Sequence, residues 1–126
     1  MPVAYFDGAC EPRNPGGVGT YGFVIYGNED DVVHEDYGIA CEPSPKCTNN
    51  VAEYTGLIKA LEWLVGNGYS GSRVIIRGDS QLVIRQLMGV YSVRAEHLRP
   101  LYDRALELLK NFSAKLEWVP RERNAS

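Results

Sequence analysis

The chain has 126 residues, enough for one domain with its own hydrophobic core. No apolar run approaches the roughly 20 residues of a membrane span, and the first residues lack the basic and apolar regions of a secretory signal, so a cytoplasmic location is expected. The net charge of -3 argues against a protein that binds nucleic acid by charge alone.

The predicted elements, in chain order, are three strands, a helix, a strand, two helices and a last strand. β-Branched and aromatic residues predict strands at Val3–Phe6, 20–27 and Val32–Ala40, with loops at 11–19 and 41–48 and a turn at 28–31. Apolar periodicity predicts a helix over Val51–Val65, a strand at Arg73–Arg77, helices over Ser80–Met88 and Ala95–Leu109, and a strand at Lys115–Val119. Short links make the first three strands antiparallel, and links through helices make the others parallel. We therefore expect one α/β domain over residues 1–126, with a mixed five-stranded sheet flanked by helices.

The distribution of charge along the chain and the spacing of the cysteines bear on the class of protein. Residues 1–72 hold 3 Lys or Arg and 10 Asp or Glu, a net of -7, whereas residues 73–126 hold 10 and 6, a net of +4. Cys10, Cys41 and Cys47 form an odd set without a C-x-x-C pair, which is typical of free thiols rather than of a disulfide framework or a zinc site. The spacing leaves a Cys41–Cys47 bridge open.

Three carboxylates stand where predicted elements begin or end: Asp7, Glu53 and Asp79. Each has a structural alternative, because Asp7 with Gly8 could form a turn, Asn50 with Glu53 has capping-box spacing, and Asp79 could cap a helix. The strands that carry the two aspartates should be adjacent, and the helix that carries Glu53 should pack across them. Converging acids would repel one another unless a hard cation neutralised them, so the pattern predicts Mg²⁺ chemistry on phosphate.

Four blocks of this sequence then resemble one known family in the right order. They are "YFDGAC…NPGGVGTYGFVI", "TNNVAEYTGLIKALEWL", "RGDSQLVIRQLMGVYSV" and "LRPLYDRALELL". Over nearly the whole chain they resemble type 1 ribonuclease H, in the compact archaeal and bacterial form without a basic protrusion. The resemblance implies the ribonuclease H-like fold, with strand order 3-2-1-4-5, and Mg²⁺-dependent hydrolysis of the RNA strand of RNA–DNA hybrids, leaving 5′-phosphate and 3′-hydroxyl ends. Two Mg²⁺ ions, with Mn²⁺ as a substitute, would be held by Asp7, Glu53 and Asp79.

The same resemblance implies a set of substrate-binding residues. It places Asn14, Asn49, Asn50 and Gln81 at the minor groove, Cys10 at the sugar-phosphate through its backbone, Thr48 and Asn50 at a DNA-strand phosphate, and Arg121 at a substrate or product phosphate. A turn role for Asn14 and a helix-capping role for Thr48 or Asn49 are the structural alternatives.

One departure from the family keeps other functions open. The family carries a fourth carboxylate in a pattern like R-x-x-N-x-x-A-D at the head of a final helix, whereas Arg121, Asn124 and Ala125 are followed only by Ser126. We therefore expect a chain that stops before the last helix. The alternatives are a catalytically impaired nucleic-acid-binding module of the same fold, and another metal-dependent nuclease of the superfamily, such as a resolvase or an exonuclease. The expected partner is an RNA–DNA hybrid, with no membrane, and the expected state is a monomer.

Overall fold

The structure is a computed structural model that describes residues 1–28 and 31–126. Its sheet has five strands in the order β3-β2-β1-β4-β5, which confirms the predicted mixed sheet and its strand order. β1 (Val3–Glu11), β2 (Val18–Tyr26) and β3 (Val32–Cys41) are antiparallel, and β4 (Arg73–Gly78) and β5 (Ser113–Trp118) run parallel to β1. The predicted turn over 28–31 contains Glu29 and Asp30, which lie outside the described residues.

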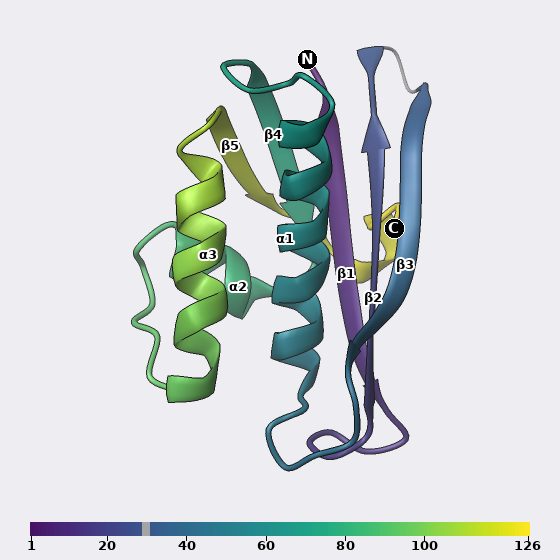
Figure 1. Cartoon of the computed structure of the whole chain (residues 1–126), viewed down its shortest axis with the longest axis vertical. Helices are drawn as coiled ribbons and strands as arrows, with labels where there is room; N and C mark the ends of the chain where they lie inside the picture. Colours follow the sequence, from purple (N-terminus) through teal and green to yellow (C-terminus); the bar gives the residue numbers. More distant parts are fainter. Residues whose placement is uncertain (29–30) are drawn as a thin grey trace.

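Three helices accompany the sheet, and Figure 1 shows α1 and α3 side by side in front of it. They are α1 (Asn49–Gly66), α2 (Gln81–Leu87) and α3 (Arg99–Leu109), with 3-10 turns at η2 (Glu96–Leu98) and η3 (Arg121–Arg123). The predicted helix over Ala95–Leu109 is in fact η2 followed by α3, because Pro100 fits the first turn of a new helix and not the interior of a longer one. Among the described residues we find no helix with the length and apolarity of a membrane span.

The core lies between the sheet and the helices. Alternating strand residues point toward α1, among them Phe6, Ile25 and Ile76, and they meet Leu57 and Leu61 of that helix, all fully buried. Burial of each such side chain stabilises the fold by about 1.5–3 kcal/mol. A buried hydrogen bond from the Tyr54 hydroxyl to Gln86 Oε1, 2.6 Å long, ties α1 to α2.

Strand β1 is longer than predicted, and this affects the position of Asp7. The Asp7–Gly8 pair does not form a turn but lies inside β1, which stays paired with β2 as far as Glu11 opposite Val18. The pairing of β1 with β4 stops earlier, at Phe6 opposite Gly78. Cross-strand pairing with β2 therefore overrides the turn preference of Asp-Gly, and β1 and β4 separate just before Asp7.

Cys41 and Cys47 form a disulfide between the end of β3 and the residue preceding the N-cap of α1. The prediction of free thiols is wrong for this pair and holds for Cys10, which is buried. Gly19 makes the bridge possible, because a Cβ atom at this position of β2 would collide with both bridged sulfur atoms.

Candidate active site

Two glycines bring helix α1 into direct contact with β1 beside Asp7. A Cβ atom on Gly8 would collide with the α1 backbone at Ala52 and Glu53, and one on Gly56 would lie 2.8 Å from the Asp7 carbonyl oxygen. Real Cβ contacts do not come this close, so any side chain at either position would push the helix away from the sheet. The pair of glycines therefore places the Glu53 carboxylate next to Asp7.

The three predicted acids meet at the point where β1 and β4 separate. Asp7 lies in β1, Asp79 follows β4 directly, and Glu53 reaches them from α1. Each contributes a carboxylate oxygen, and these oxygens lie within 4.8 Å of one another. Glu53 is buried, with 6% of its surface exposed, and the two aspartates are half-buried. The structure thus brings together all three residues that the sequence singled out.

Neither Glu53 nor Asp79 caps a helix. The side-chain oxygen of Thr48 accepts the first-turn N–H of α1, and that of Ser80 accepts the first-turn N–H of α2, each at 3.2 Å. The Asn50–Glu53 capping box is therefore not formed, and Glu53 lies beyond the first turn of α1. Of the predicted structural alternatives, the capping role of Thr48 is confirmed. Asn14 also lies in a turn, which a hydrogen bond from the Gly17 N–H to the Arg13 carbonyl oxygen closes.

The electrostatics of the cluster are unfavourable without a cation. Burial, followed by the charges of Asp79 and Asp7, raises the pKa of the Glu53 carboxyl from 4.5 to about 8. Burial and the Asp79 charge also raise the pKa of Asp7, against the opposing effects of the Gly8 N–H and of Arg121. Among the described residues, the buried atoms Glu53 Oε2 and Asp79 Oδ2 have no hydrogen-bond partner.

This donor set fits a hard divalent metal ion. Three carboxylates offer only oxygen ligands, which Mg²⁺ and Mn²⁺ prefer. A bound cation would supply the partner that the two buried oxygens lack, and its charge would offset the burial and the repulsion that together raise the pKa of Glu53. The residues that would hold the metal ion are therefore Asp7, Glu53 and Asp79.

The segment after β5 also reaches this cluster. Arg121, in η3, lies close enough for its charge to oppose the rise in the pKa of both Asp7 and Glu53. Two neighbours were not predicted: the Trp118 indole N–H donates to the Asp79 carbonyl oxygen (3.0 Å), and the Asn124 amide donates to the Phe6 carbonyl oxygen (2.9 Å). Asn124 belongs to the family pattern quoted above, but no local signal in the sequence indicates the role of Trp118.

The predicted amide residues form a second group where the β1–β2 loop meets the head of α1. Asn14 Nδ2 donates to Asn49 Oδ1 (2.7 Å), and the Asn49 backbone N–H donates to Asn14 Oδ1 (3.1 Å). Asn50 is half-buried in the first turn of α1, beside the N-cap Thr48. This pairing gives Asn14 and Asn49 a fixed relative orientation.

Two further predicted residues lie in different settings. Gln81 is exposed at the start of α2, two residues after Asp79. Cys10 is buried, and its thiol points inward to the carbonyl oxygens of Arg13 (3.0 Å) and Cys47 (3.3 Å). The Cys10 thiol is therefore engaged inside the protein, and the backbone contact that the resemblance implies stays a prediction.

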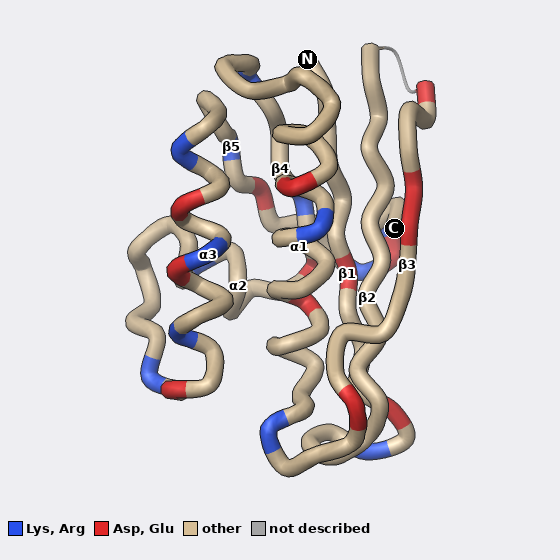
Figure 2. The backbone as a smooth tube through the Cα atoms, in the orientation of Figure 1, with Lys and Arg blue, Asp and Glu red and all other residues tan. Residues whose placement is uncertain are grey.

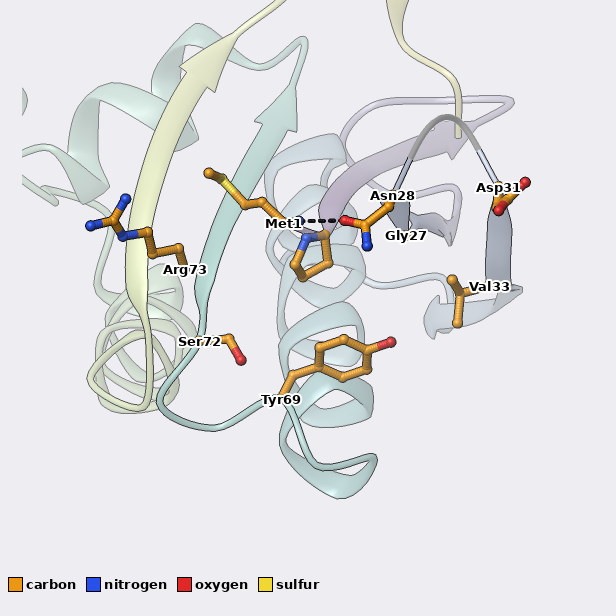
Figure 3. A pocket seen from close by; sticks show the side chains of 9 residues that line it. Met1, Gly27, Asn28, Asp31, Val33, Tyr69, Ser72 and Arg73 are labelled. Carbon is orange, nitrogen blue, oxygen red and sulfur yellow. Dashed lines mark hydrogen bonds between the residues drawn. The ribbon is translucent and has the colours of Figure 1, made fainter.

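A surface pocket lies at the other end of the sheet. Figure 3 shows it lined by Met1, Asn28, Tyr69 and Arg73, with the Met1 ammonium group donating to Asn28 Oδ1 (2.6 Å). Arg73 begins β4, whereas Asp79 follows the end of that strand. The pocket is therefore separate from the acidic cluster.

Comparison with known proteins places this architecture in one family. Residues 5–126 match the family model described as "Reverse transcriptase-like". Ribonuclease HI of Halobacterium salinarum is 38% identical over 122 residues, covering 96% of this chain and 57% of that protein. The bifunctional protein Rv2228c of Mycobacterium tuberculosis is 38% identical over 112 residues, covering 88% of this chain and 29% of that protein. The chain thus spans little more than half of the first relative and less than a third of the second.

Solved structures agree with these sequence matches. The crystal structure of RNase H1 from Halobacterium salinarum has a TM-score of 0.84 at 37% identity, covering 98% of this chain and 88% of that one. The N-terminal RNase H domain of Rv2228c gives 0.83 at 34%, covering 98% and 84%. LC11-RNase H1, solved in complex with an RNA/DNA hybrid, gives 0.85 at 31%, covering 99% and 89%. With the sheet order, the three acids and these matches in agreement, the chain belongs to the type 1 ribonuclease H family.

Proposed function

We propose that this chain is a metal-dependent endoribonuclease that hydrolyses the RNA strand of RNA–DNA hybrids and leaves 5′-phosphate and 3′-hydroxyl ends. The observation that carries the proposal is the convergence of Asp7, Glu53 and Asp79, with two buried oxygens that lack a partner among the described residues. The substrate class is supported by the likeness to LC11-RNase H1, whose structure holds an RNA/DNA hybrid.

Mg²⁺ is the proposed cofactor, and Mn²⁺ can replace it. Asp7, Glu53 and Asp79 would hold a pair of such ions, which would supply Lewis-acid activation of a water molecule and stabilisation of the departing 3′-oxygen in an in-line displacement. The contribution of the chain itself is to hold the three acids at one point and to set Arg121 beside them, where its guanidinium can pair with a phosphate of substrate or product.

Recognition of the RNA strand is assigned to the amides. The groups of Asn14, Asn49, Asn50 and Gln81 can both donate and accept, which suits the 2′-hydroxyls of a minor groove. Each NH₂ group carries two hydrogens, so Asn14 keeps donor capacity beyond its bond to Asn49. Thr48 and Asn50 are assigned to a phosphate of the DNA strand, and the Cys10 backbone to the sugar-phosphate.

The charge distribution agrees with this placement. Figure 2 shows acidic positions along β3, at one edge of the sheet, whereas α3 and β5, toward the other edge, carry basic and acidic positions together. A polyanion is repelled by the β3 edge, so charge favours binding away from it. A cytoplasmic location and a monomeric state stay predictions from the sequence.

The test is cleavage of end-labelled RNA–DNA hybrid beside RNA–RNA and DNA–DNA duplexes, with Mg²⁺ or Mn²⁺. We expect cleavage of the hybrid alone, with termini that a 5′-phosphate-specific exonuclease accepts. Asn14→Ala and Gln81→Ala should reduce the preference for hybrid over DNA duplex, whereas Asn67→Ala, at the exposed far end of α1, should not. Binding of hybrid without cleavage would favour the impaired module, and cutting of the DNA duplex would favour another nuclease of the superfamily.

A further inference from the structure

The C-terminal part of the chain supports the two strand ends that carry the catalytic aspartates. The parallel ladder between β1 and β4 ends at Phe6 opposite Gly78. Beyond this pair the two strands separate, and main-chain carbonyls near the ladder's end need partners from elsewhere. These carbonyls belong to Phe6, which precedes Asp7 in β1, and to Gly78 and Asp79, at and directly after the end of β4.

Residues 118–124 supply those partners, and we call this segment the C-terminal brace. The Val119 backbone N–H donates to the Gly78 carbonyl (2.9 Å), which extends the β4–β5 pairing by one residue. The Trp118 indole then donates to the Asp79 carbonyl at 3.0 Å, and the Asn124 amide donates to the Phe6 carbonyl at 2.9 Å. The segment after β5 thereby returns to β1 (Figure 1).

Each of these side chains acts on a peptide unit next to a metal-binding carboxylate. The Phe6 carbonyl belongs to the same planar peptide group as the Asp7 N–H, so a bond to it fixes the backbone from which the Asp7 side chain extends. The Asp79 carbonyl belongs to the peptide group that joins Asp79 to Ser80, so the bond from Trp118 fixes the backbone directly after the Asp79 side chain. The carboxylates of Asp7 and Asp79 carry like charges at close range, and their repulsion tends to drive the strand ends apart. The brace opposes that movement from both sides.

We propose that Trp118 and Asn124 are positioning residues, which together hold the main chain at Asp79 and Asp7 so that the carboxylates keep the separation a divalent metal ion requires. The inference rests on the proposed function, because it assumes that the three acids bind metal. Groups that hydrogen-bond to metal-ligating residues and orient them influence the affinity for the metal ion without touching it. The loss of one hydrogen bond of ordinary strength corresponds to a factor of about two to ten in a binding constant.

The experiment measures the Mg²⁺ concentration at half-maximal thermal shift for the full chain and for Trp118→Phe, Asn124→Ala and the double variant. Trp118→Phe keeps an aromatic ring at this position but removes the N–H donor together with part of the ring system. We expect each single variant to raise the Mg²⁺ midpoint by about twofold to tenfold, and the double variant to raise it further. The KM for hybrid should stay near that of the wild type, and saturating Mg²⁺ should restore kcat. A residue needed only for folding would not give this recovery.

Two matched variants separate positioning from general packing. Trp118→His keeps a ring N–H at nearly the same distance from Cβ as the indole N–H, so it should return the Mg²⁺ midpoint toward the wild-type value. Trp63→Phe makes the same kind of change at the other tryptophan, which stacks on His34 with ring centroids 4.8 Å apart, and should leave the midpoint unchanged. In that variant Trp118 is the only tryptophan, and its fluorescence should respond to Mg²⁺ at the midpoint of the thermal shift.

Unchanged Mg²⁺ midpoints in both Trp118→Phe and Asn124→Ala would overturn the inference while leaving the proposed function in place. A Mg²⁺ midpoint for Trp118→His as high as that of Trp118→Phe would overturn the role of Trp118. If Trp118→Phe does not fold, Trp118→His and Asn124→Ala still decide the question. Wild-type protein that neither binds Mg²⁺ nor cleaves hybrid would overturn the proposed function itself.

Discussion

Replacing Glu53 with glutamine should remove most of the pH dependence of stability in the metal-free protein. Burial, then the charges of Asp79 and Asp7, raises the Glu53 pKa from 4.5 to about 8 in the folded chain, and the pKa returns to its ordinary value on unfolding. Between these two values the folded state holds a proton that the unfolded state has released. Stability from this group is therefore complete below about pH 4.5, and it is lost as the pH rises through the folded pKa of about 8.

The magnitude follows from the size of the shift. At 1.36 kcal/mol per pKa unit, a change from 4.5 to about 8 is worth roughly 5 kcal/mol, of which about 3–4 kcal/mol falls between pH 5 and pH 8. In a domain of this size 1 kcal/mol moves the melting temperature by about 4 °C. The metal-free protein should then melt roughly 10–15 °C lower at pH 8 than at pH 5 on account of this group.

The assay is thermal unfolding followed by circular dichroism in chelator, in half-unit steps from pH 5 to pH 8. The Glu53→Gln curve should be nearly flat, whereas Glu42→Gln, at an exposed loop position, should keep the wild-type slope. Saturating Mg²⁺ should reverse the trend, because the ion binds the ionised carboxylates and competes with protons. A wild-type melting temperature that stays constant over this range, or a Glu53→Gln variant with the wild-type slope, would refute the reasoning.

Three further outcomes are expected. Asp79→Asn should abolish hybrid cleavage and yet raise metal-free stability by roughly 1 kcal/mol, because it relieves like-charge repulsion; a lower melting temperature without metal would contradict this. Millimolar Mg²⁺ should raise the melting temperature of the wild type, and Asp7→Asn should blunt the shift, so an equal shift in both proteins would count against the site. Reduction of the Cys41–Cys47 bridge, which closes a loop with a sequence separation of 6, should cost about 2 kcal/mol in a comparison of melting with and without a dithiol. Cys41→Ser should show no such dependence, and a melting temperature indifferent to the dithiol in the wild type would contradict the expected stabilisation.

Much of the fold was predictable because its signals are local. Alternating apolar residues in the strands and helical spacing in α1 and α3 lie within short windows of sequence, so the order of elements and the mixed sheet could be predicted from them. The identity of the three acids was also predictable, because each stands beside such an element. The bounds were less accurate: the Asp7–Gly8 pair looks locally like a turn, and only pairing with β2 shows that β1 continues to Glu11.

What the tertiary structure decided depends on contacts between distant parts of the chain. The disulfide needs the space that Gly19 leaves on another strand, and the capping roles of Thr48 and Ser80 free Glu53 and Asp79 for the cluster. The raised pKa of Glu53 exists only once burial and two other carboxylates surround it. The hydrogen bonds of Trp118 and Asn124 join residues 39 and 118 positions apart, and a main-chain carbonyl as acceptor leaves no mark on the sequence. Sequence alone therefore determined which three acids are candidate metal ligands. The fold decided which groups surround these acids and hold them together.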